Sequence, residues 1–292
     1  MLTPAEAADL FRSPPRGFIP VGDGAEVAHR VIGSGPAVLF VHGWPVSGAT
    51  FRTLLPHLVD HVTCHVIDLP GAGASRYLAS TPLSLGLHVR SVRAVIDALG
   101  VDDVAVVGHD SGGMIARHAV AGHPRLRSMG LIDTEHTGTL SWRFRSFVAG
   151  RHVPGFGAAM GFAASRPRVR RNPLVFGAAF SDRSHLDGEF AEFFFDPLHR
   201  SKEYLDATMR LFRSFDPQMV RDLEGLHQRI TVPVQLVWGE LDRFFPVRKA
   251  EQMVSTFPNA RMHVVEGAGT FSHEERPAEV AEALLQVLTT GH

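Results

Sequence analysis

The chain has 292 residues, 29 lysines and arginines against 30 aspartates and glutamates, 45% hydrophobic residues and a single cysteine. This length allows one large core with an insertion, and the near-zero net charge gives no indication of a nucleic-acid or membrane partner. No apolar run reaches the ~18 residues of a transmembrane helix, and the first residues lack the features of a signal peptide. We therefore expect a cytoplasmic protein, monomeric or homodimeric, that acts on a small molecule.

The first half of the chain alternates predicted strands and helices, a pattern typical of a mostly parallel sheet with helices on both faces. Two short strands flank the turn Gly22-Asp23-Gly24 and predict a hairpin. The strands expected here are 18–21, 26–32, 36–42, 63–68, 103–107 and 128–132, and the helices are 50–58 and 83–99. Strands are expected again at 232–238 and 261–265, followed by a last helix over 277–288.

Between these two strand-rich parts, residues 135–225 have no clear strand pattern and hold 12 of the 20 phenylalanines. We interpret this segment as a helical cap domain, inserted into a core made of residues 1–134 and 226–292. The arginine-rich stretch 166–171 is expected to be a solvated loop. The many phenylalanines favour a bulky apolar or aromatic substrate.

The segment Gly108-His109-Asp110-Ser111-Gly112-Gly113 joins the apolar strand 103–107 to a helical pattern. A sharp strand-to-helix turn that exposes one reactive side chain is a nucleophile elbow. The residues two before and two after its centre must be small. Glycines flank Asp110 in this way, whereas the large His109 would flank Ser111. The spacing therefore favours Asp110 as the nucleophile, and a carboxylate attacks a saturated carbon.

Four landmarks occur in the order of the α/β-hydrolase fold, which this chain resembles over nearly its whole length. They are His42-Gly43-Trp44-Pro45, the elbow at Asp110, Gly239-Glu240-Leu241-Asp242 and Gly267-Ala268-Gly269-Thr270-Phe271. The resemblance implies an eight-stranded, mostly parallel sheet with a helical cap, and neither a cofactor nor a metal. With an aspartate at the elbow, the chain is most similar to epoxide hydrolases, and next to haloalkane and haloacetate dehalogenases.

The resemblance implies a reaction in two halves. Asp110 attacks an electrophilic carbon and forms an alkyl-enzyme ester, while the backbone N–H groups of Trp44 and Ser111 form an oxyanion hole. Water then attacks the ester with the help of a histidine that is held by an acid. Asp242 is the favoured acid and Asp133 the alternative. His42 is expected to bond the local backbone.

The expected histidine is missing, because Thr270 stands where the family has it, and threonine cannot accept a proton near neutral pH. Three explanations are open: an introduced substitution that halts turnover, a native protein that no longer hydrolyses the ester, or His273 acting as an alternative base. The hydrolytic half-reaction is expected to be impaired or altered in the first two cases.

Epoxide hydrolases use cap tyrosines to protonate the ring oxygen, and Tyr204 is the only tyrosine in the expected cap. Trp142, His136 or His185 is a candidate second donor. The alternatives to an epoxide hydrolase are a haloalkane dehalogenase-like hydrolase, and a cyclase, rearrangement enzyme or ligand-binding protein on the same fold. A haloacid substrate is disfavoured, because Ser111 and Met114 stand where fluoroacetate dehalogenases carry arginines.

Overall fold

The computed structural model describes residues 2–138 and 140–289, and its centre is a nine-stranded sheet. The strand order is β1-β2-β4-β3-β6-β7-β8-β9, with β5 beside β2. Parallel pairing joins the strands β4, β3, β6, β7, β8 and β9. Antiparallel pairing joins β1, β2 and β5 to one another and β2 to β4. The bounds are β1 Gly17–Gly22, β2 Ala25–Gly33, β3 Ala37–Val41, β4 Thr63–Asp68, β5 Arg76–Tyr77, β6 Val104–His109, β7 Leu126–Ile132, β8 Val234–Gly239 and β9 Ala260–Val265.

The central strands are buried on both faces, as expected for near-continuous runs of Val, Leu and Ile. In β3, Leu39 and Val41 belong to one hydrophobic cluster, while Val38 and Phe40 belong to the cluster on the opposite face. Successive side chains of a strand point to opposite faces, so each strand supplies both halves of the core. The predicted mostly parallel sheet with helices on both faces is confirmed.

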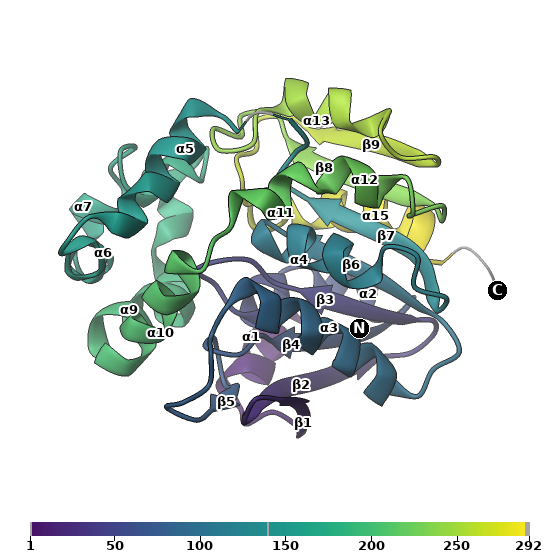
Figure 1. Ribbon diagram of the computed structural model, residues 1–292, viewed down its shortest axis with the longest axis horizontal. Helices are drawn as coiled ribbons and strands as arrows, with labels where there is room; N and C mark the ends of the chain where they lie inside the picture. Colours follow the sequence, from purple (N-terminus) through teal and green to yellow (C-terminus); the bar gives the residue numbers. More distant parts are fainter. Residues whose placement is uncertain (1, 139, 290–292) are drawn as a thin grey trace.

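Helices cover both faces of the sheet (Figure 1). The first face carries α3 Leu85–Leu99, α4 Ser111–Val120, α11 Pro217–Arg221, α12 Leu223–His227 and α13 Val247–Val254. The second face carries α1 Pro4–Arg12, α2 Leu55–Leu58, α14 Ser272–Glu275 and α15 Pro277–Leu288. No helix in the described ranges combines the length and apolarity needed to cross a bilayer.

Three helices of the core, α1, α13 and α14, were not among those expected, and α1 has a clear local cause. Thr3 and Glu6 form a capping box, and Pro4 occupies the first helical turn, where its missing N–H leaves no bond unmade. The expected helix at 50–58 is instead a 3₁₀ turn at Gly48–Phe51 followed by the short α2.

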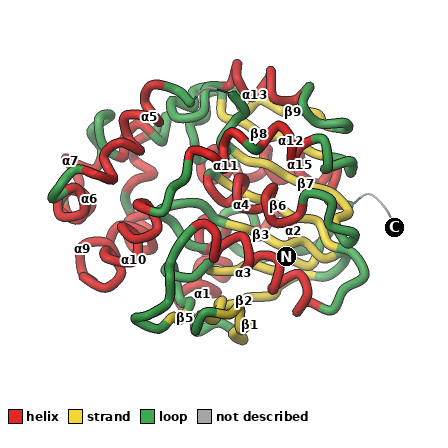
Figure 2. Tube along the Cα trace, viewed as in Figure 1, coloured by secondary structure: helices red, strands yellow, loops and turns green. Residues whose placement is uncertain are grey.

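The insertion between β7 and β8 contains no strand among its described residues and folds into helices that lie beside the sheet (Figure 2). They are α5 Trp142–Ala149, α6 Phe156–Ser165, α7 Pro167–Arg170, α8 Gly188–Phe190, α9 Asp196–Arg200 and α10 Lys202–Arg213, followed by α11 and α12. The last two helices of this segment, α11 and α12, pack on α4 of the core.

Ion pairs hold the helical insertion to the core on the side of α1. Arg12 and Arg52, which belong to the core, both bond Glu189, and Arg12 also bonds Glu192. Arg52 in addition forms a buried pair with Glu274 of α14 at 2.7 Å. These ion pairs hold the helical insertion against the core.

Candidate active site

Asp110 lies between the end of β6 and the start of α4, with a φ of 51° and a ψ of −137°. A positive φ is strained for a residue other than glycine and is common at functional sites. A Cβ on Gly112 would lie 2.2 Å from the carbonyl oxygen of Val41, and one on Gly108 would lie 2.6 Å from the Cα of Gly113. The tight turn therefore requires glycine on both sides of Asp110, whereas Ser111 is the first residue of the helix.

Backbone N–H groups hold one oxygen of the Asp110 carboxylate. The amide of Trp44 donates to Oδ2 at 2.8 Å, and both the amide and the hydroxyl of Ser111 also bond the carboxylate. Gly43 allows this approach, since a Cβ there would lie 2.4 Å from Oδ2. Burial raises the pKa of Asp110 to about 6 against the opposing effect of these donors, so the carboxylate is mostly ionised at pH 7.

His42, at the start of the same loop, bonds local backbone. Its Nδ1 lies 2.8 Å from the carbonyl of Gly43, and its Nε2 accepts the amide of Leu69 at 2.9 Å. Burial lowers the pKa of the imidazole, which keeps the ring neutral. His42 therefore bonds the local backbone, as expected from the sequence.

Thr270 forms a hydrogen bond with Asp242. The Thr270 hydroxyl donates to Oδ1 of Asp242 at 2.7 Å, and the amides of Phe244 and Phe245 donate to the same oxygen at 2.8 and 2.9 Å. Among the described residues, Oδ2 of Asp242 has no hydrogen-bond partner. Burial raises the pKa of Asp242 to about 7, and the charge of Asp110 adds to this effect. The two sequence landmarks thus come together, but no imidazole lies between them.

Asp133, the alternative acid, braces the sheet. Its Oδ1 accepts the amide of Gly239 at 2.7 Å, and its Oδ2 accepts the amide of Ser272 at 3.1 Å and the hydroxyl at 2.5 Å. Both oxygens are therefore occupied by the ends of β8 and the start of α14. Burial raises the pKa of Asp133 well above its usual value.

His273, the alternative base, is fully buried away from the cavity. Its Nε2 lies 2.8 Å from the hydroxyl of Thr50, and its ring packs between Phe51 and His109. Burial lowers the pKa of this imidazole well below its ordinary value. The structure does not bring His273 to Asp110, because the first turn of α14 directs it toward the second face of the sheet.

Tyr204 also lies outside the cavity that holds Asp110. It lines a separate pocket on the far side of the Trp44 loop, together with Gly71 and Ala72, and its hydroxyl bonds the backbone of Gly73. Of the other predicted donors, Trp142 is exposed, His185 stacks on Phe180, and His136 packs edge-on against Phe245. Among the described residues, none of these side chains lines this cavity or the side pocket that also contains Asp110.

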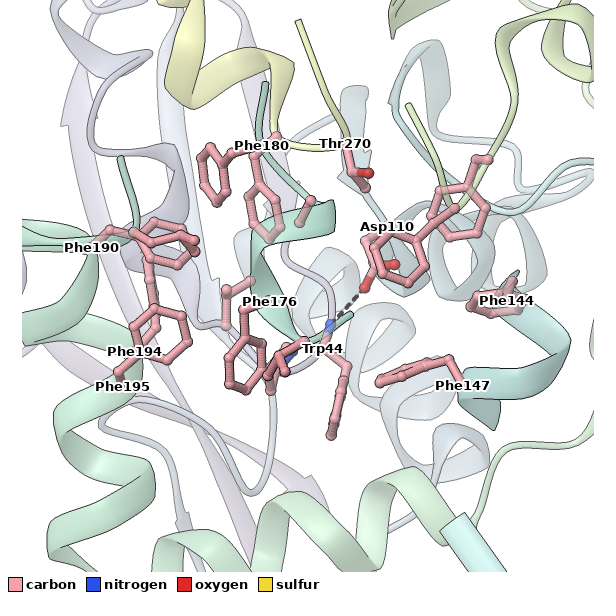
Figure 3. Close-up of a pocket in the computed structure, with 18 residues that line it drawn as sticks. Trp44, Asp110, Phe144, Phe147, Phe176, Phe180, Phe190, Phe194, Phe195 and Thr270 are labelled. Carbon is pink, nitrogen blue, oxygen red and sulfur yellow. Dashed lines mark hydrogen bonds between the residues drawn. The ribbon is translucent and has the colours of Figure 1, made fainter. Parts of the chain in front are cut away.

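The cavity above Asp110 is almost entirely apolar (Figure 3). Its polar groups belong to Asp110, Thr270 and Trp44, and its free volume is ≈ 90 Å³. Such a volume is smaller than the ~150 Å³ of an engineered cavity that admits benzene, so a bulky substrate requires the cap to move. Ten phenylalanines line it: Phe144, Phe147, Phe176, Phe180, Phe190, Phe194, Phe195, Phe244, Phe245 and Phe271.

A buried carboxyl that the sequence patterns did not single out lies near Asp110. Glu135 and Asp110 line one side pocket of the site, and Glu135 is 1% exposed. Burial and the charge of Asp110 raise the pKa of Glu135 to about 8, so the group is mostly protonated at pH 7. The only signal available in the sequence was its position three residues after the end of β7.

Arg117 of α4 fixes the segment that carries Glu135. Its Nη2 donates to the carbonyl of Glu135 at 2.7 Å and to the hydroxyl of Thr134 at 2.9 Å. Thr134 also donates to the carbonyl of Asp110 at 2.7 Å. These bonds tie the backbone of Glu135 to the elbow. The described residues form no group of three or more side chains suited to hold a metal ion.

The comparisons with known proteins agree with this architecture. Residues 36–277 match the family model described as alpha/beta hydrolase fold, and the chain belongs to this family. It is 28% identical over 268 residues to the pimeloyl-[acyl-carrier protein] methyl ester esterase of Xanthomonas campestris, covering 87% of this chain and 95% of the esterase.

Two solved structures share the fold. An alpha/beta hydrolase fold protein from Burkholderia ambifaria superposes with a TM-score of 0.77 at 21% identity, covering 94% of this chain and 98% of that protein. The epoxide hydrolase CorEH superposes with a TM-score of 0.76 at 20% identity, covering 93% and 98%. At these identities the likeness concerns the fold, and esterases and epoxide hydrolases both occur among the neighbours.

Proposed function

We propose that this hydrolase-fold protein opens an epoxide on an apolar or aromatic substrate through an ester at Asp110. The observation that carries the proposal is the Asp110 carboxylate at the strained elbow, with Oδ2 held by the amide of Trp44 and the residue facing a phenylalanine-lined cavity. A carboxylate fixed in this way presents its other oxygen for in-line attack on carbon.

In the first half-reaction, Oδ1 of Asp110 forms a bond to a ring carbon, and the bond between this carbon and the ring oxygen breaks. The electron pair of that bond goes to the oxygen, which needs a proton because an alkoxide is a poor leaving group. We assign the proton donor to Glu135 in place of Tyr204. Glu135 shares a pocket with Asp110, and its pKa of about 8 leaves the proton in place at neutral pH.

The second half-reaction lacks its usual base. Histidine is absent among the described residues that line the cavity, and Thr270 occupies the place next to Asp242. Hydrolysis of the ester is therefore slow relative to its formation, and the ester accumulates. A non-hydrolytic rearrangement, in which a substrate group displaces Asp110, is the alternative that the same observation favours.

A haloalkane dehalogenase-like activity is less well supported. Indole N–H groups are suited to hold a leaving halide, but the Nε1 of Trp44 donates to the carbonyl of Thr208 at 2.9 Å. Trp238 donates to Phe245 at 2.7 Å, and Trp142 is exposed on the outer face of the cap. These are the three tryptophans of the chain, so no indole donor remains for a halide.

The proposal is tested by incubating the protein with aryl epoxides, aryl haloalkanes and aryl esters, and measuring products together with intact mass. We expect an added mass equal to that of the epoxide and little diol. The Asp110→Asn variant should show no added mass. Halide release, or ester cleavage without an adduct in either protein, would overturn the assignment.

A further inference from the structure

The charges of this chain are unevenly distributed. Residues 136–181 contain seven arginines and no aspartate, glutamate or lysine, which leaves 22 basic and 30 acidic residues elsewhere. The neutral total therefore combines a segment of net charge +7 with a remainder of −8. The net charge of the whole chain gives no indication of affinity for an anionic membrane. An anionic membrane surface does, however, attract local clusters of arginine.

Most of these arginines have no acidic partner among the described residues. Arg170 and Arg171 both pair with Asp187. The other five, which are Arg143, Arg145, Arg151, Arg166 and Arg168, form no ion pair with the described part of the chain. Arg145, Arg166 and Arg168 are exposed. Their charge faces solvent and is free to meet anions outside the molecule.

The same segment exposes large apolar side chains. Of the seven large hydrophobic residues exposed in the described ranges, four lie here: Trp142, Val153, Phe162 and Leu174, at 71, 57, 58 and 81% exposure. The outer face of α6 adds Ala158 and Ala159, which are also exposed. An exposed apolar patch bordered by cations is typical of a helix that lies in a membrane interface.

Contacts join the apolar and basic groups. Arg143 lies over the ring of Trp142 at 5.2 Å and donates to the carbonyl of Pro173 at 3.2 Å, and Arg166 lies over the ring of Phe162 at 5.7 Å. The helices α6 and α7 lie at the end of the insertion away from the sheet, and α5 lies nearer to the strands (Figure 1). We call the set Trp142, Arg145, Phe162, Arg166, Arg168 and Leu174 the cap patch.

We propose that the cap patch docks the protein on the surface of an anionic lipid bilayer, with the arginines against the headgroups and Trp142, Phe162 and Leu174 in the interface. Helix α5 connects this surface to the site, because its inner side contributes Phe144 and Phe147 to the cavity wall. An apolar substrate dissolved in the bilayer would then reach the cavity along the cap. This docking does not depend on the chemistry at Asp110.

The test is co-sedimentation of the whole protein with phosphatidylcholine vesicles that contain or lack about a third of phosphatidylglycerol. We expect binding to the anionic vesicles only, with loss of binding at 0.5 M salt, since screening shortens the reach of the charges. Each arginine near an anionic surface strengthens binding by roughly fivefold. Arg166→Glu with Arg168→Glu should therefore weaken binding by at least about 25-fold.

Matched variants separate docking from general charge or folding effects. Arg248→Glu with Arg261→Glu makes the same charge change on exposed core residues and should leave binding within about twofold. Leu174→Ser should weaken binding, whereas Leu78→Ser, at a residue 59% exposed on the core, should not. Equal binding of the cap and core variants, or no binding to anionic vesicles, would overturn the proposal. A vesicle-independent dimer that Leu174→Ser dissociates would overturn it as well.

Discussion

The hydroxyl of Thr270 donates to Oδ1 of Asp242 at 2.7 Å, in the place where the family resemblance leads one to expect an imidazole. The amides of Phe244 and Phe245 hold the same carboxyl, so the acid is positioned although it has no base to orient. In the proposed mechanism, the site therefore has the acid that would support a histidine and lacks the histidine itself at residue 270.

A histidine at position 270 should supply the base that the proposed second half-reaction lacks. In Thr270→His, the ring would take the place of the hydroxyl beside Asp242 and could activate water, which typically contributes 10²–10⁴-fold. We expect diol release to rise by ~10²-fold or more in the epoxide assay. Thr270→Ala, which removes the hydroxyl without adding a base, is the control and should stay at the parent rate. Identical diol release from all three proteins would contradict this account.

Glu135 should control ester formation. Asp110 ionises near pH 6 and Glu135 loses its proton near pH 8. We therefore expect a bell-shaped pH profile for the rate of ester formation, with an acid limb near pH 6 and an alkaline limb near pH 8. Because the two groups interact, the limbs belong to the pair. Glu135→Gln should lower the rate by ~10²-fold and remove the alkaline limb. Asp242→Asn is the control and should keep that limb, because Asp242 lines neither the cavity nor the side pocket that Glu135 shares with Asp110. A limb that survives in Glu135→Gln would exclude Glu135 as the donor.

Burial of Asp110 should make stability depend on pH. Its pKa rises from 3.8 to about 6 on folding, so the folded state binds the proton more tightly than the unfolded state. The stability that this group contributes is fully present below about pH 4 and is lost as the pH rises through 6. Asp110→Asn should therefore melt at a higher temperature than the parent at pH 7 and at a similar temperature at pH 4. A difference that does not change between these pH values would show that ionisation is not its cause.

The elbow glycines can be tested by stability alone. Gly112→Ala places a Cβ 2.2 Å from the carbonyl oxygen of Val41, and we expect a loss of about 1–3 kcal/mol or more in the free energy of unfolding. Gly225→Ala, in α12 with no atom within 4 Å of the new Cβ, should be neutral or stabilising by up to about 1 kcal/mol. Denaturant unfolding of both variants measures the difference, and a Gly112→Ala protein as stable as the parent would refute the close approach.

Much of the sheet could be predicted from the sequence, because the central strands are mostly apolar and have glycine, proline or aspartate near their ends. β4 and α15 begin and end at the predicted residues, β3 is one residue shorter at each end, and β9 begins one residue earlier. Local patterns were insufficient where the cap meets the core. Tyr204 was predicted as a donor from its residue type, but the packing of α10 places it in another pocket. Glu135 follows no motif, and only the three-dimensional arrangement brings it beside Asp110.

The most direct measurement is the location of the epoxide adduct by peptide mass spectrometry after a single turnover. The account predicts one modified peptide, with the added mass on Asp110, in the parent and in Ser111→Ala. It also predicts that the adduct persists in the parent and disappears faster in Thr270→His. An adduct on Ser111, or complete conversion to diol by a protein whose Asp110 is never modified, would contradict the account.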